Sequence, residues 1–129
     1  MRDRRRCVAQ SYDQGFAGLP EVIVPARSAD VEHAWHLYPI RLRLDALRIG
    51  RDAVIEELKA RGIGTSVHFI PLHMHPYYRS VFGYEPGEFP NASAAFTSLI
   101  SLPIYPSMTH DGIERVVAEV SDIVVRNRR

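Results

Sequence analysis

The sequence has few features that would place the protein outside the cell or in a membrane. Cys7 is its single cysteine, so no disulfide can form within the 129 residues. No apolar run approaches the roughly 20 residues that cross a bilayer. The charged start "MRDRRR" also lacks the apolar core of a signal peptide. These absences predict a cytoplasmic protein without a membrane partner.

Lysine and net charge are scarce as well. Lys59 is the single lysine among 16 basic residues, and the formal net charge is only +1. A balance this even creates no strong field toward nucleic acid. The arginine clusters at the two ends, "MRDRRR" and "RNRR", are typical of solvated helix ends. We therefore predict no nucleic-acid partner.

What is present fits one globular domain over residues 1–129. Hydrophobic residues make up 46% and charged residues 24% of the chain, as in ordinary globular proteins, and this length can bury one core. There is no internal repeat and no linker.

Helical periodicity is clearest at the two ends of the chain. Val8, Tyr12 and Phe16 are four residues apart, which predicts a helix over 1–16. Apolar residues over 109–125 recur at helical spacing, with Thr109 as the expected N-cap. Residues 51–62 read as a helix that Gly62 closes. Two further helices are expected, a short one over 76–83 and one over 91–101.

Four extended segments complete the pattern: 21–25, 33–44, 65–69 and 102–106. The segment 65–69, "TSVHF", is expected to be a buried strand, and Pro39 within "HAWHLYPIRLRL" implies an edge position or a bulge. Asn91 is the expected cap of the helix over 91–101. The order predicts an α+β fold, a small, mainly antiparallel sheet with helices packed on it.

Histidines and aromatics gather over 62–87, "GIGTSVHFIPLHMHPYYRSVFGYEPG". A zinc site needs three or four convergent ligands, but His68, His73 and His75 match no metal motif, and neither do His33 and His36. We predict no metal site and interpret these histidines as hydrogen-bonded in or near a core.

Two other chemistries remain open for the same stretch. A histidine could act as a general acid or base, but no nucleophile elbow, phosphate loop or carboxylate pair accompanies it. Tyr77, Tyr78, Phe82 and Tyr84 lie beside Arg79, and such a group either binds a base or phosphate or packs its rings on the sheet.

Several phrases together resemble one family. "HAWHLYPIRL" is followed by a helix, then by "KARGIGTSVHFIPLHMHPYYR", and finally by "SLPIYPSMT" before a terminal amphipathic helix. This order is similar to the C-terminal, small domain of the DegT/DnrJ/EryC1/StrS family of pyridoxal-phosphate (PLP) aminotransferases. The resemblance covers essentially the whole chain.

The resemblance implies amination of a nucleotide-linked keto sugar, with a UDP-4-keto sugar as the expected substrate and glutamate as the amino donor. The product would serve surface polysaccharide or lipopolysaccharide biosynthesis. In the family, the catalytic lysine and the PLP site belong to a large domain that these residues do not include. It also implies that residues 1–17 are the remnant of an interdomain helix and that the protein is a homo-oligomer.

Catalytic residues are not expected in this chain. A Schiff-base lysine needs a pocket that lowers its pKa, whereas Lys59 lies on the polar side of its helix. The chain alone is therefore expected to bind no PLP and to be inactive.

The family motif assigns the residues of the substrate side. They are His68, His73, Tyr77, Tyr78 and Arg79, with Trp35 and His36 supporting the cleft. Two alternative functions stay open: a non-catalytic binding or assembly module, and a histidine-rich metal protein.

Overall fold

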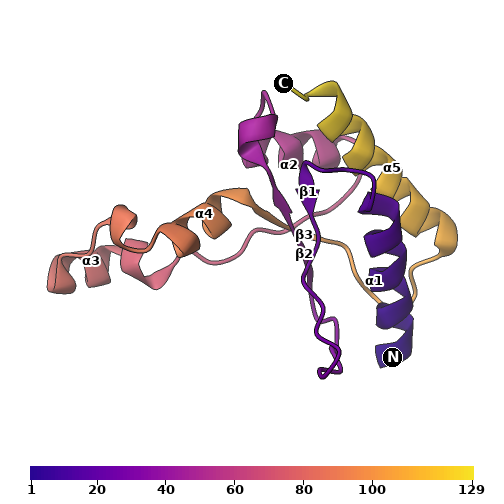
Figure 1. The fold of residues 1–129 in the computed structure, drawn as a ribbon, viewed down its shortest axis with the longest axis horizontal. Coiled ribbons are helices and arrows are strands. Elements are labelled where there is room, and N and C mark those ends of the chain that lie inside the picture. Colours follow the sequence, from indigo (N-terminus) through magenta and orange to yellow (C-terminus); the bar gives the residue numbers. More distant parts are fainter.

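Three short strands form an antiparallel sheet in the order β1-β2-β3, and the chain has five helices: α1, α2 and α5 lie beside the sheet, whereas α3 and α4 lie on a segment that projects away from it (Figure 1). The computed structural model describes residues 1–129. The strands are β1 (Val22–Ile23), β2 (Tyr38–Leu42) and β3 (Leu99–Leu102). The helices are α1 (Arg2–Phe16), α2 (Arg51–Ala60), α3 (Pro76–Phe82), α4 (Pro90–Ser98) and α5 (His110–Arg126). The predicted α+β class with a small antiparallel sheet is confirmed.

Pro39 lies in the central strand, yet its surroundings are those of an edge. It pairs with Ser101 of β3, whereas β1 pairs only with Arg41 and Leu42 of β2. Opposite Pro39, the other side of β2 therefore has no strand partner. Because proline has no N–H to donate, it is tolerated where the ladder is interrupted.

The expected buried strand over 65–69 is wrong. This segment makes one isolated bridge, Ser66 with Ser101, and Val67 and Phe69 are exposed. The third strand is instead β3, which begins inside the helix expected over 91–101. That helix ends at Ser98, and Asn91 does not cap it, because Pro90 already occupies its first turn.

The core lies between the sheet and the pair of helices α1 and α5. Residues of both helices are fully buried, among them Tyr12, Phe16 and Val120. At the crossing, a Cβ built on Gly15 would lie 2.7 Å from both γ-carbons of Val117. A glycine here allows the two helix backbones to approach closely.

α2 ends as its sequence predicts. Gly62 has a φ of 75°, its N–H donates to the Lys59 carbonyl, and the Ile63 N–H donates to the Leu58 carbonyl. This pair of bonds is the Schellman motif, which satisfies carbonyls at a helix end. Ile63 and Leu58 are both buried, so the same turn attaches α2 to the core.

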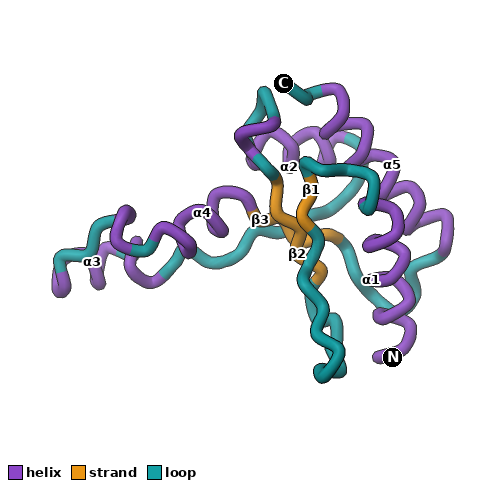
Figure 2. Tube along the Cα trace, in the orientation of Figure 1, coloured by secondary structure: helices purple, strands orange, loops and turns teal.

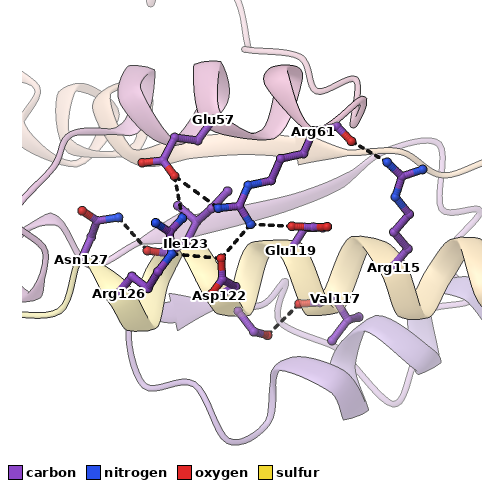
Figure 3. A network of polar contacts seen from close by, with 10 residues as sticks. Glu57, Arg61, Arg115, Val117, Glu119, Asp122, Ile123, Arg126 and Asn127 are labelled. Carbon is purple, nitrogen blue, oxygen red and sulfur yellow. Dashed lines mark hydrogen bonds and ion pairs between the residues drawn. The ribbon is translucent and has the colours of Figure 1, made fainter.

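A polar network joins α2 to α5 (Figure 3). Arg61 at the end of α2 donates to Glu119 and to Asp122 on α5, and Arg126 bridges Asp122 and Glu57. The hydrogen bond from Arg61 holds the pKa of Asp122 below its usual range, with Arg126 adding to the effect.

Two segments project from this body in different directions (Figure 1). We call residues 67–98 the arm; it carries α3 and α4 and two 3₁₀ turns, Leu72–Met74 and Pro86–Glu88. Residues 24–37 connect β1 to β2 as a long loop without helix or strand (Figure 2). We call this segment the β1–β2 loop.

Candidate functional site

The arm carries most of the residues that the sequence singled out. Its surface is unusually apolar: Phe69 is 97% exposed, and Leu72 and Tyr77 are about two-thirds exposed, at 65% and 66%. Val67, Ile70, Val81 and Phe82 are also exposed. An apolar surface of this kind marks a site that contacts another protein segment or a ligand.

His73 is buried at the centre of the arm. Its Nε2 lies 3.2 Å from the Ser93 hydroxyl, which donates its own hydrogen to the Pro86 carbonyl at 2.8 Å. Ser93 can therefore only accept from the imidazole, so Nε2 carries the hydrogen of neutral His73. The ring also packs on Phe89, with 4.6 Å between centroids. These contacts hold the turn at 72–74 against α4.

An aromatic ladder runs from the buried His73 to the exposed tip of the arm. Phe89 meets Tyr84 at 5.3 Å, Tyr84 stacks on Phe82 at 5.5 Å, and Phe82 stacks on Tyr78 at 6.1 Å between centroids. Tyr77 closes the ladder, perpendicular to Tyr78. The structure thus connects His73, Tyr78 and Tyr77, three of the predicted substrate-side residues.

His68 lies outside this ladder, at the base of the arm. Its Nε2 is 3.0 Å from the hydroxyl of Ser101 in β3, and the ring is half-buried. Arg79, the fifth predicted residue, lies on α3 and is exposed. The contacts with Ser93 and Ser101 escaped sequence reasoning, because 20 and 33 residues separate the partners.

Trp35 and His36 lie on the β1–β2 loop and not on the arm. Trp35 is 2% exposed and has a φ of 51°, which makes it the single non-glycine residue with positive φ. His36 is exposed. Arg5 Nη1 donates to the carbonyl oxygens of both residues, at 3.3 and 3.5 Å. These two residues therefore secure the loop to α1.

Lys59 is placed on the surface, as its sequence context indicates. Its side chain is 74% exposed, and its ammonium lies 3.7 Å from Glu56. Such an open position offers no pocket for an aldehyde cofactor, so the single lysine does not fit a PLP-binding role. No group of three or more His, Cys, Asp or Glu residues lies where it could hold a metal ion. None of the helices has the length and apolarity to cross a bilayer.

Comparisons with known proteins agree on one family. The profile of the DegT/DnrJ/EryC1/StrS aminotransferase family matches residues 1–121. The uncharacterized protein MJ1066 of Methanocaldococcus jannaschii is 52% identical over 128 residues, covering 99% of this chain and 33% of that protein. The spore coat polysaccharide biosynthesis protein SpsC of Bacillus subtilis is 43% identical over 125 residues, covering 96% of this chain and 32% of that protein.

A solved structure shows the same fold. The putative sugar aminotransferase Spr1654 of Streptococcus pneumoniae, in its PMP form, superposes with a TM-score of 0.84 at 28% identity. The match covers 96% of this chain and 31% of that one. The chain therefore spans about a third of the length of the relatives that it matches.

Proposed function

Because this chain belongs to the DegT/DnrJ/EryC1/StrS aminotransferase family, we propose that it acts as the small, C-terminal domain of an enzyme that aminates a nucleotide-linked keto sugar. The expected substrate is a UDP-linked 4-keto sugar, with glutamate as the amino donor. SpsC, by its name, serves polysaccharide biosynthesis, which supports a product destined for a surface glycan. α1 would then connect this domain to the large one.

The cofactor is proposed to be held by residues outside this chain. Spr1654 has been solved in PLP and PMP forms, and the family is one of aminotransferases that use this cofactor. When bound, the cofactor carries the amino group between donor and sugar. Lys59 is too exposed to hold it, so the chain alone is proposed to be inactive.

The aromatic ladder of the arm is the observation that carries the proposal. Tyr77 and Tyr78 at its exposed end present planar rings and phenol groups that can orient sugar hydroxyls and exclude water. Arg79 on the same helix provides a fork of N–H donors suited to a diphosphate. His73 serves the site by holding the ladder in place, because its imidazole hydrogen-bonds Ser93 and packs on Phe89.

A chimera tests the proposal directly. The corresponding third of SpsC is replaced by this chain, and amino transfer from glutamate to a UDP-linked 4-keto sugar is measured. Arg79→Gln should raise KM for the nucleotide sugar about tenfold, the loss expected for one charge-assisted hydrogen bond. Lys59→Arg should leave the activity unchanged.

Arg48→Gln is the matched control, since Arg48 is exposed and its side chain makes no hydrogen bond or ion pair in the structure. A folded chimera without transfer activity would contradict the assigned function. Equal KM values for the Arg79 and Arg48 variants would contradict the placement of the arm at the substrate.

The exposed apolar surface of the arm favours a second candidate, an assembly module that associates with copies of itself. Sedimentation of the isolated chain separates the two. Phe69→Ser should convert an oligomer to a monomer if the arm mediates self-association, whereas a chain that is monomeric without this change argues against the assembly role.

A further inference from the structure

A cavity lies between the first turns of α1 and the β1–β2 loop, far along the sequence from the arm. Its volume is about 300 Å³, within the range of small-ligand sites. The side chains that give it its chemistry are Arg2, Arg6, Arg27, Glu32, His33 and Trp35.

Hydrogen-bond donors dominate this lining. Three guanidinium groups meet there from two elements, and Glu32 is the single carboxylate among the lining residues. Arg2 contacts Glu32 at 2.9 Å, Arg6 pairs with Asp3 at 2.8 Å and approaches Glu32 at 3.9 Å, and Arg27 pairs with Asp13. Each guanidinium has five N–H groups, so these contacts leave most of the donors free.

His33 adds another donor. The backbone N–H of Trp35 donates to His33 Nδ1 at 2.8 Å. In the neutral ring the hydrogen therefore lies on Nε2, which is left as a donor for a ligand.

The loop holds these groups in a costly conformation. The positive φ of Trp35 is unfavourable for a bulky residue, and such strain persists at ligand sites where the surroundings enforce it. Three contacts enforce the conformation of Trp35: Arg27 lies over the indole at 4.5 Å, the His33 ring is tilted against it with 4.3 Å between centroids, and Arg5 donates to the Trp35 carbonyl.

We propose that this cavity binds a phosphate monoester, with the Glu32 carboxylate occupying the anion position when no ligand is bound. A phosphate offers three terminal oxygens to the three guanidiniums, whereas a carboxylate offers only two. The Glu32 contacts are exposed, with that side chain 57% accessible, so a dianion displaces them at little cost. Ala26 and Val31 provide an apolar wall for the organic part.

Trp35 is the only tryptophan and lies in the cavity wall, so its fluorescence reports binding directly. The whole chain is titrated with glycerol 3-phosphate, inorganic phosphate and succinate at constant ionic strength. Glycerol 3-phosphate should saturate at the lowest concentration, inorganic phosphate should follow, and succinate should bind most weakly.

Three isosteric or matched variants locate the site. Arg6→Gln should weaken glycerol 3-phosphate binding at least about tenfold, as expected for a lost charge-assisted bond. Glu32→Gln should tighten it several-fold, because the competing carboxylate is gone. Arg4→Gln also removes one positive charge from α1, but Arg4 contacts the Pro106 carbonyl and does not line the cavity. The Arg4→Gln variant should therefore bind glycerol 3-phosphate as tightly as the unaltered chain does.

The proposal is overturned if no phosphate compound gives a saturable fluorescence change, or if Arg4→Gln and Arg6→Gln weaken binding equally. Tighter binding of succinate than of glycerol 3-phosphate would also overturn it, because the site would then be one for carboxylates.

Discussion

The close contact of Gly15 with Val117 allows a prediction in which two known effects oppose each other. Replacing Gly15 by alanine adds a Cβ that would lie 2.7 Å from both γ-carbons of Val117 and 3.3 Å from its Cβ. Rotation of Val117 cannot relieve the overlap, because both methyl groups are involved and valine in a helix has one favoured rotamer.

The sign of the change in stability follows from the sizes of the two opposing effects. Overpacking a closely fitted site costs about 1–3 kcal/mol, whereas alanine in place of glycine inside a helix gains up to about 1 kcal/mol. Gly15→Ala should therefore lower the free energy of unfolding by up to about 2 kcal/mol. In a Val117→Ala background only the 3.3 Å contact is left. There, Gly15→Ala should raise the free energy of unfolding by up to about 1 kcal/mol.

Urea unfolding of the four proteins of this double-mutant cycle, followed by Trp35 fluorescence, gives the coupling energy, expected at about 1–3 kcal/mol. Circular dichroism of each variant checks that the helices are retained. If Gly15→Ala is destabilising by the same amount in both backgrounds, the contact with Val117 is not the cause and the reasoning fails.

Two further predictions concern the dependence of stability on pH. Burial raises the pKa of Tyr12 and of Tyr38, so their neutral forms stabilise the fold below about pH 10, and this stability is lost as the pH rises further. The double variant Tyr12→Phe, Tyr38→Phe should therefore lose less stability than the unaltered chain between about pH 8 and about pH 11. Urea unfolding at both pH values measures the two losses, and equal losses in the two proteins would show that the burial argument is wrong. The lowered pKa of Asp122 contributes stability above about pH 4 that disappears as the pH falls. Arg61→Gln should therefore destabilise the chain at neutral pH and make its stability depend less on pH in acid. An acid unfolding profile that Arg61→Gln leaves unchanged would refute the role of this pair.

Local signals in the sequence determined the helices α1, α2 and α5. Their apolar spacing, the N-cap at Thr109 and the left-handed Gly62 are properties of a few neighbouring residues, so the same features recur in the structure. Thr109 indeed accepts from the Gly112 N–H at 3.1 Å. The α+β class followed from the order of such elements.

The strands were less predictable, because a short apolar run fits a buried strand or a helix equally well. Residues 99–101 looked like the end of the helix over 91–101, but pairing with β2 makes them part of β3. "TSVHF" has strand composition, yet its backbone pairs with β3 only through the bridge between Ser66 and Ser101, and Phe69 lies in solvent. A strand exists only where a partner supplies its hydrogen bonds.

The family and the residues of the arm could be inferred from the sequence through its resemblance, whereas their arrangement could not. The aromatic ladder from His73 to Tyr78 passes through Phe89, and His68 is hydrogen-bonded to Ser101. The arginines of the first turn looked like a solvated helix end, and only folding places Arg2 beside Glu32. Periodicity and caps are local and can be read from the chain, but contacts across 30 residues are decided by the packing of the whole fold.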